Sequence, residues 1–342
     1  MAVDRAAAGI RLLKEFVVKV LLAHTPEMRR NYYGDRSLSG LRAAAEVILH
    51  ESDETLDAAG LVRAAKDADI IVADRMTEGR GEIFAQLPRL RAFVRCAVDI
   101  RNVDVEAASK AGVLVTRAGP GFVQAVAELA IGFMVDLSRG VSRATADYQA
   151  GRKPEARMGR QLAGSRIGII GYGSIGRYLA EVAKVLRMEV LVADPFATVS
   201  DAGIRQVGLD ELLAASDYVV CLAIANEQTE NLIGEAALAR MQRHAVFVNL
   251  SRGNLVDEAV LARALLEHRI AGAAMDVGRA PDQMPTPELA KLPNVIATPH
   301  VGGLTPQAIE YQSLETVRQV EAIVKSEIPP GAVNAERWTR RP

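Results

Sequence analysis

At 342 residues, the chain is longer than a single hydrophobic core ordinarily supports, so two domains are expected. Apolar residues make up 49% of the chain and charged residues 24%, which excludes an intrinsically disordered protein and indicates a globular one. The formal net charge of −1 argues against a nucleic-acid-binding protein, because such a protein needs a basic face.

The N-terminal segment, residues 1–24, contains an apolar-looking stretch, but four charged residues between positions 11 and 19 interrupt it. It is therefore too polar to span a bilayer, and no small-residue cleavage site follows a clean apolar core. We expect residues 1–17 to form a helical extension and residues 18–23 to form the first strand. The segment predicts no association with a membrane.

Short apolar and β-branched runs alternate with helix-length segments along the whole chain, which is typical of parallel α/β architecture. The first series of expected strands comprises residues 18–23, 46–49, 69–73, 91–97 and 113–116. The second series comprises residues 166–170, 189–193, 217–221, 245–249, 271–275 and 294–297. Six strands in the second series is the number found in a doubly wound Rossmann sheet.

The two cysteines, Cys96 and Cys221, both fall in these apolar, strand-like runs. They form neither a CxxC redox pair nor a set large enough for a disulfide framework. We therefore expect two buried, unreactive thiols in a cytoplasmic protein.

A long helical pattern over residues 122–149 and a polar arm over 150–163 separate the two series of strands. Another amphipathic helix is expected over residues 306–325, after the last strand. We expect this helix to complete the first domain, so that the second domain is inserted into the first. The prediction is a discontinuous, flavodoxin-like substrate domain of residues 1–119 and 304–342 around a Rossmann domain of residues 120–303.

The segment Gly171–Gly176 (GYGSIG) follows a predicted strand and opens a predicted helix, which is the context of a dinucleotide-binding turn. Gly171 would make the tight turn, Gly173 would let the backbone approach a pyrophosphate, and Gly176 would let the helix pack on the strand. The pyrophosphate would lie at the helix N-terminus. A glycine turn without a nucleotide is the other interpretation, and the complete context favours the nucleotide.

Asp194 ends the next predicted strand, 18 positions after Gly176. A carboxylate there accepts hydrogen bonds from the ribose hydroxyls of NAD and repels the 2′-phosphate of NADP. The sequence therefore predicts NAD as the cofactor.

Three further strands of the second series are each followed by polar residues, which are Ser251 and Arg252, then Asp276, then His300. Ligands of open α/β sheets bind beyond the carboxyl ends of the strands, so we expect these residues to share one crevice with the dinucleotide. An arginine fits the carboxylate and carbonyl of a 2-oxo acid. A histidine supplies the proton that the carbonyl oxygen needs when hydride arrives, and a carboxylate behind the imidazole would orient it.

The segments GYGSIGRYLA, NLSRGNLVDEAVLARAL, AAMDV and LPNVIATPHVGGLT together resemble the D-isomer-specific 2-hydroxyacid dehydrogenases, a family that includes phosphoglycerate dehydrogenase and glyoxylate/hydroxypyruvate reductase. The similarity covers about residues 90–325. It implies a homodimer formed through the long helix and arm, with Arg252 binding substrate and His300 acting as the acid/base. Val98 and Asp99 would join Arg252 at the substrate. The expected cofactor contacts are Gly171, Gly173, Ser174, Ile175, Gly176, Asp194, Ile224, Ala225, Thr229, Leu250, Ser251, Arg252, Asp276, His300 and Gly302.

The sequence departs from the family pattern in two loops that bear on catalysis. Pro281 stands where the family usually has a glutamate, and Asp282, one residue further on, is the candidate carboxylate for orienting His300. In the substrate loop, Asp99 occupies a glycine position and Arg101 replaces an acid. Leu222 and Ile224 likewise replace a histidine and a proline, so the resemblance does not identify the substrate.

Each of these residues also has a purely structural interpretation. His300 could be a capping or core histidine and Arg252 a surface ion-pair partner, but their places after buried strands favour function. Asp282 could equally be an ordinary loop carboxylate. Arg101 is more easily explained as a solvated charge than as a second anion site. The other histidines lack metal-ligand spacing, so no metal site is predicted.

The sequence thus predicts an NAD-dependent oxidoreductase that interconverts a small 2-oxo acid and its D-2-hydroxy acid. The alternative is an NAD(H)-sensing binding protein, like the corepressors that share this fold. The presence of both Arg252 and His300 favours the enzyme.

Overall fold

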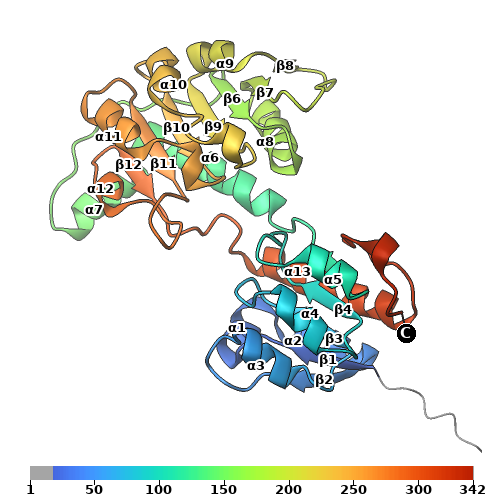
Figure 1. Cartoon of the computed structure of the whole chain (residues 1–342). Coiled ribbons are helices and arrows are strands. Elements are labelled where there is room, and N and C mark those ends of the chain that lie inside the picture. Colours follow the sequence, from blue (N-terminus) through green and yellow to red (C-terminus); the bar gives the residue numbers. More distant parts are fainter. Residues whose placement is uncertain (1–17, 342) are drawn as a thin grey trace, which may run out of the picture. The chain divides into compact units, whose positions relative to one another are not determined.

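The computed structural model describes residues 18–341, so the predicted helical extension over residues 1–17 lies outside the described residues. The chain forms two compact units, each with its own parallel sheet (Figure 1). One unit contains the described residues up to Pro120 and from Ile309 onward, and the other is Gly121–Ala308. The second unit is therefore inserted into the first.

The first unit is built around five parallel strands in the order β2-β1-β3-β4-β5. This is the flavodoxin-like order of a doubly wound sheet. Its elements are β1 (Lys19–Leu22), α1 (Pro26–Tyr32), α2 (Asp35–Ala44), β2 (Glu46–Leu49), α3 (Ala58–Ala64), β3 (Ile70–Ala73), α4 (Gly81–Gln86), β4 (Ala92–Arg95), α5 (Val105–Lys110), β5 (Leu114–Arg117), most of α13 (Pro306–Val324) and the short helix η3 (Ala335–Arg337).

Both faces of the central strands β1, β3 and β4 are buried, which explains why these strands are largely apolar. Alternate strand residues such as Leu21 and Phe93 pack with α3, α4 and α5 on one face. Their neighbours Val20 and Val94 pack on the other face with side chains of α2 and α13. The C-terminal helix thus completes the first unit.

The second unit is built around seven parallel strands in the order β12-β11-β10-β9-β6-β7-β8. Counted from β6, the first six strands have the Rossmann order 3-2-1-4-5-6, with β12 added at one edge. The elements are α6 (Val123–Arg139), α7 (Val141–Gln149), β6 (Arg166–Ile170), α8 (Ser174–Val185), β7 (Glu189–Ala193), β8 (Ile204–Gln206), α9 (Leu209–Ala215), β9 (Tyr218–Cys221), η1 (Glu227–Thr229), α10 (Glu235–Arg240), β10 (Val246–Asn249), η2 (Gly253–Leu255), α11 (Glu258–Leu266), β11 (Gly272–Met275), α12 (Pro287–Ala290) and β12 (Val295–Ala297).

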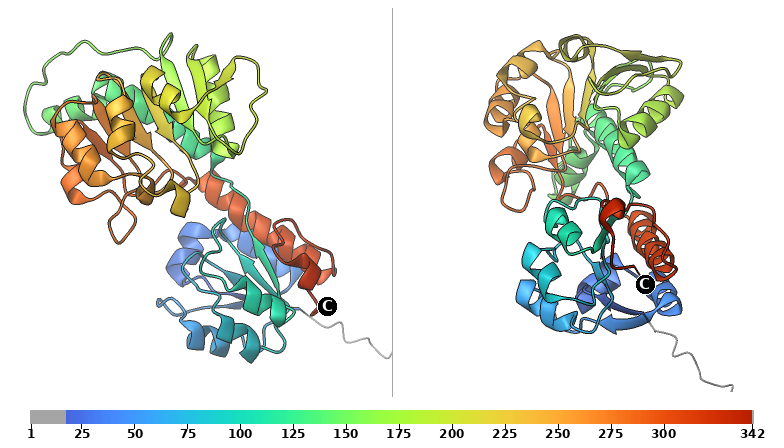
Figure 2. Two further views of the ribbon diagram at one scale, coloured as in Figure 1. Left: turned by 45° about the horizontal axis from the view of Figure 1, so that its top comes forward. Right: turned by 45° about the vertical axis from the view of Figure 1, so that its right-hand side comes forward.

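Helices cover both faces of this sheet (Figure 2). Side chains of α9, α10 and α11 pack on one face, and those of α6 and α8 pack on the other. The fold class predicted from the sequence, two doubly wound parallel-sheet units with one inserted into the other, is confirmed.

Two details of the prediction were wrong. The second sheet has a seventh strand, β8, which the sequence pattern did not indicate because it has three residues at the sheet edge and two of them are exposed. The helical pattern over 122–149 is two helices, because Gly140 lies between them with φ 66°. This left-handed conformation favours glycine and ends α6.

The two thiols are buried as expected. Burial raises the pKa of Cys96 and that of Cys221 to about 12, so both are protonated and unreactive at neutral pH. Among residues 18–341, no helix is both long enough and apolar enough to cross a membrane.

Candidate active site

The predicted cofactor and catalytic residues follow the carboxyl ends of six neighbouring strands in the second unit. Because the sheet is parallel, these ends form one edge, in the order β12, β11, β10, β9, β6, β7. The residues follow that order as His300 and Gly302, Asp276, Leu250 to Arg252, Ile224 and Ala225, Gly171 to Gly176, and Asp194. This edge is where an open α/β sheet binds its ligand.

The glycine turn between β6 and α8 requires its glycines for different reasons. Gly171 has φ 98°, and a Cβ there would lie 2.7 Å from the Leu222 carbonyl oxygen. At Gly176 a Cβ would lie 2.2 Å from the Gly171 carbonyl oxygen, so the helix could not pack so closely. A Cβ at Gly173 would meet no atom within 4 Å, and no side chain caps the helix that starts at Ser174. This turn leaves an open approach to the N-terminus of α8 and fits the pyrophosphate of a dinucleotide.

Asp194 is held in place by the glycine turn. Its carboxylate accepts hydrogen bonds from the backbone amides of Tyr172 (2.7 Å) and Phe196 (2.8 Å), one at each oxygen. A carboxylate oxygen has a second lone pair, so both oxygens keep the capacity to accept a ribose hydroxyl. Asp194 is therefore a pre-oriented acceptor.

The loop after β9 is ordered by hydrogen bonds within it. The Thr229 hydroxyl donates to the Ile224 carbonyl at 2.7 Å, and Asn226 and Thr229 cap each other's backbone. Ile224 is exposed. These residues, with Ala225, lie beside the glycine turn because β9 pairs with β6.

Arg252 lies on a turn that Asn249, a fully buried residue, holds in place. The Asn249 amide donates to the Arg252 carbonyl (3.0 Å), and its oxygen accepts from the Ser251 amide (3.1 Å). The Ser251 hydroxyl donates to the Ala223 carbonyl at 2.5 Å. Sequence reasoning missed Asn249, although an asparagine that ends the apolar run VFVN is a signal of such a role.

His300 lies on a turn that Asp276 organises. The Asp276 carboxylate accepts from the Thr298 hydroxyl (2.6 Å) and from the backbone amides of Val301 and Gly302 (both 2.8 Å). The His300 amide donates to the Asp276 carbonyl at 3.0 Å. His300 itself has φ 54°, a left-handed conformation that costs about 1–3 kcal/mol and persists only where the surroundings enforce it. Buried Asp276 supplies that enforcement; a contact with the cofactor stays a prediction.

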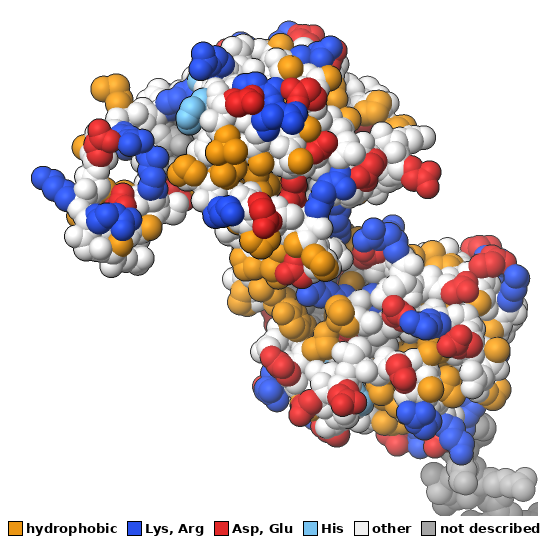
Figure 3. Space-filling model, turned by 60° about the vertical axis from the view of Figure 1, so that its left-hand side comes forward, with side chains coloured by type: hydrophobic (Ala, Val, Ile, Leu, Met, Phe, Trp, Pro, Cys, Tyr) orange, Lys and Arg blue, Asp and Glu red, His pale blue; other side chains and the backbone are white. Residues whose placement is uncertain are grey.

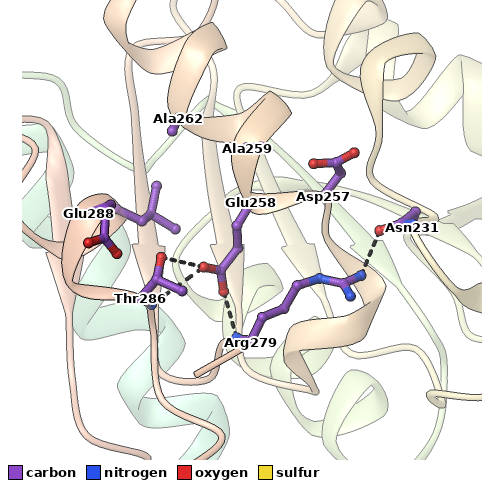
Figure 4. A pocket seen from close by; sticks show the side chains of 9 residues that line it. Asn231, Asp257, Glu258, Ala259, Ala262, Arg279, Thr286 and Glu288 are labelled. Atoms are coloured by element: carbon purple, nitrogen blue, oxygen red, sulfur yellow. Dashed lines mark hydrogen bonds between the residues drawn. The ribbon is translucent and has the colours of Figure 1, made fainter. Parts of the chain in front are cut away.

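The loop that contains Asp282 is anchored by Glu258, which is 7% exposed (Figure 4). The Glu258 carboxylate accepts from the Arg279 amide (2.8 Å) and the Thr286 hydroxyl (2.6 Å). These residues line a cavity of about 450 Å³ beside α11. Asp282 is exposed and accepts from the Met284 amide (3.0 Å). The orienting role of Asp282 toward His300 stays a prediction.

The predicted substrate residues Val98 and Asp99 belong to the first unit, where they follow β4. The Asp99 carboxylate pairs with the Arg101 guanidinium at 2.6 Å, so Arg101 serves its own loop. Within the described part of the chain, the backbone amides of Ala97 and Val98 donate to no acceptor. Two adjacent amides of this kind suit an anionic group.

Basic and acidic side chains are interspersed over the face of the molecule drawn in Figure 3. Exposed ion pairs are frequent among the described residues, for example Arg152 with Asp147 and Arg166 with Glu189. On that face there is no continuous basic stripe of the kind that tracks a phosphate backbone.

Comparison with known sequences gives a consistent set of relatives. The family model described as D-isomer specific 2-hydroxyacid dehydrogenase, NAD binding domain, matches residues 131–302. The glyoxylate reductase of Korarchaeum cryptofilum is 31% identical over 316 residues, which cover 90% of this chain and 95% of the relative. The D-3-phosphoglycerate dehydrogenase of Methanocaldococcus jannaschii is 32% identical over 297 residues, which cover 84% of this chain and 56% of the relative. The chain thus spans little more than half of that second protein.

Solved structures share the fold. A protein from Thermus thermophilus matches with a TM-score of 0.81 at 27% identity, over 92% of this chain and 100% of that chain. The D-lactate dehydrogenase of Lactobacillus jensenii, solved with NAD⁺, matches with a TM-score of 0.80 at 24% identity, over 92% of this chain and 99% of that chain.

Proposed function

The chain belongs to the D-isomer specific 2-hydroxyacid dehydrogenases, which are NAD-dependent oxidoreductases. On this basis we propose that it interconverts a small 2-oxo acid and its D-2-hydroxy acid. Arg252 binds the substrate carboxylate and carbonyl, and His300 is the acid/base. The first unit is the substrate domain, and the second is the NAD-binding domain.

The observation that supports this proposal is that Arg252 and His300 follow strands at the same edge of the second sheet. Arg252 follows β10 and His300 follows β12, and β11 lies between these strands. Buried side chains hold each turn, Asn249 for the first and Asp276 for the second. A binding protein that only senses NAD(H) needs neither an anion clamp nor a titrating group held at this edge.

The chemistry assigned to these residues follows from their charges. NAD supplies the hydride acceptor or donor when it is bound. In the direction of reduction, Arg252 holds the planar carboxylate and carbonyl through its forked donors, and the free amides of Ala97 and Val98 are further candidates for the carboxylate. His300 then donates its proton to the oxygen that becomes the hydroxyl, and it accepts that proton in the oxidative direction.

The experiment that tests the proposal is a panel of 2-oxo acids followed by the absorbance of NADH. We expect turnover with at least one small member, and glyoxylate and hydroxypyruvate come first because relatives carry those names. The corepressor-like alternative predicts tight NADH binding with no turnover on any member of the panel. That result would remove the enzyme proposal.

We also propose that the chain works as a cytoplasmic homodimer. Apolar side chains on α6, α7 and the arm are exposed, which suits a subunit interface. They are Val135, Val141, Tyr148 and Met158. Sedimentation equilibrium measures the oligomeric state directly, and a monomer at micromolar concentration would contradict the proposed dimer.

We expect NAD to be preferred over NADP by about a hundredfold or more in kcat/KM, because Asp194 meets the 2′-phosphate with like charge. Asp194→Ser combined with Phe196→Arg should relax this preference, since Phe196 is exposed two residues further on. Asp210→Ser is the control, because it removes another exposed carboxylate of the second unit, one that pairs with Arg240 (3.0 Å) and not with the glycine turn. Equal kcat/KM values for the two cofactors in the unmodified protein would show that Asp194 does not select.

A further inference from the structure

Arg95 ends strand β4 in the first unit and is only 2% exposed. All five of its guanidinium N–H groups donate hydrogen bonds, and none goes to a carboxylate. The acceptors are the carbonyl oxygens of Asp74, Arg75, Thr77 (2.7 Å) and Asp99 (3.3 Å) and the side-chain oxygen of Asn102 (2.7 Å). A buried cation is costly unless its donors are satisfied, so this arrangement is specific to arginine.

These acceptors belong to two loops at the carboxyl edge of the first sheet. The loop after β3 is braced by Asp74, whose carboxylate accepts from the Thr77 amide (3.0 Å) and the Thr77 hydroxyl (2.7 Å). The loop after β4 contains Asp99 and Asn102. A backbone bond joins the two loops directly, from the Gly79 amide to the Asn102 carbonyl at 3.0 Å. Arg95 therefore lies at the centre of one hydrogen-bonded network.

The segment held by this network carries the free amides described above. Arg95 binds the Asp99 carbonyl, and Arg101 binds the Asp99 carboxylate, so this residue is held at two points. Ala97 and Val98 lie between Arg95 and Asp99 along the chain, and within residues 18–341 nothing accepts from their amides. The network thus fixes the backbone on both sides of a pair of unused donors.

We propose that Arg95 is a positioning residue, which holds the 97–102 segment in the conformation that binds the substrate carboxylate. This inference rests on the proposed function, because it assumes that the segment meets a 2-oxo acid. Lysine cannot replace Arg95, since an ammonium group is a point charge with three donors and cannot serve acceptors spread around a planar fork.

Arg95→Lys tests the proposal, with Arg91→Lys as the matched control. Arg91 directly precedes β4, at the end of the strand opposite to Arg95. It pairs with Asp69 at 3.6 Å, away from both loops. Asn102→Ala is the milder variant, because it removes one of the five acceptors. The first readout is the dissociation constant of oxamate, a non-reducible 2-oxo acid analogue, from the NADH complex. The second is hydrogen–deuterium exchange of residues 97–104, and the third is the affinity for NADH alone.

We expect Arg95→Lys to weaken oxamate binding by about tenfold or more, since sub-ångström shifts of positioning groups have effects of this size. Exchange at the bonded amides of Arg101 and Val103 should accelerate, while NADH affinity stays within about twofold of the unmodified protein. Asn102→Ala should show the same pattern more weakly, and Arg91→Lys should show neither change. If Arg95→Lys does not fold, Asn102→Ala tests the proposal instead, with the same three measurements of oxamate affinity, exchange and NADH affinity.

Two results would overturn the proposal. In the first, hydrogen–deuterium exchange of residues 97–104 accelerates in Arg95→Lys, but this variant binds oxamate as tightly as Arg91→Lys does. Arg95 would then have a purely structural role. In the second, exchange in 97–104 does not change. Failure of the proposed function looks different, because the unmodified protein would then bind no oxamate and reduce no 2-oxo acid; that result would remove both proposals together.

Discussion

His300→Asn is expected to lower kcat for reduction of the preferred 2-oxo acid by about 10²–10⁴-fold, the range that proton transfer by a positioned side chain contributes. Asparagine retains a hydrogen-bond donor of similar size, but it has no titratable proton to give to the substrate oxygen. It also tolerates the left-handed backbone that His300 adopts, with φ 54°, better than most residues, so the turn should survive. The measurement is single-turnover reduction at saturating NADH, together with NADH affinity, which should be unchanged.

Asp282→Asn is the matched control for this variant, because it removes the candidate orienting carboxylate and leaves the imidazole in place. We expect a much smaller loss of kcat than for His300→Asn. If the loop moves toward the histidine during turnover, the alkaline limb of the pH–rate profile for reduction should shift to lower pH. An unchanged profile would exclude Asp282 as the partner of His300. Turnover within about tenfold of normal in His300→Asn would exclude His300 as the proton donor.

Arg252→Lys is expected to behave nearly as badly as Arg252→Ala. A lysine keeps the positive charge but not the forked donors that match a carboxylate and its adjacent carbonyl. We expect a loss of about 2–4 kcal/mol in transition-state binding, or about 30- to 900-fold in kcat/KM, with NADH affinity little changed.

Arg166→Lys is the control for that substitution. Arg166 is also an arginine of the second unit that uses several donors, to Glu189 and to the Ala215 carbonyl, but it begins β6, at the opposite edge of the sheet. It should keep its kcat/KM. Near-normal turnover in Arg252→Lys would mean that Arg252 is not the clamp, whereas equal losses in both variants would point to a general effect on the unit.

The strands were predictable because a parallel sheet buries both faces. Runs such as IGII (167–170), VLVA (190–193) and AFV (92–94) are then apolar at every position, and the turn residues that follow them mark their ends. β8 escaped prediction because three residues at an exposed edge carry no such pattern. The break at Gly140 was not predicted because the apolar spacing of α6 continues into α7. The helical backbone is nevertheless interrupted at Gly140.

By itself, the sequence determined which side chains stand at the carboxyl ends of strands, because strand ends and glycine turns are local features. Arg252, His300, Asp194 and the Gly171–Gly176 turn were all located in this way. Their order along one edge follows from strand pairing, which joins segments far apart in the chain.

Only the tertiary structure decided which buried groups hold those side chains in place. Asp276 reaches the His300 turn because β11 pairs with β12, although more than 20 residues separate the bonded atoms. Arg95 bonds the loop after β3 because β3 pairs with β4, and Glu258 holds the Asp282 loop from the start of α11. A side chain's hydrogen-bond partner depends on which backbone it meets after folding. The spacing of residues along the sequence does not indicate that partner. A polar residue at the end of an apolar run does indicate that its side chain will be buried and will need one.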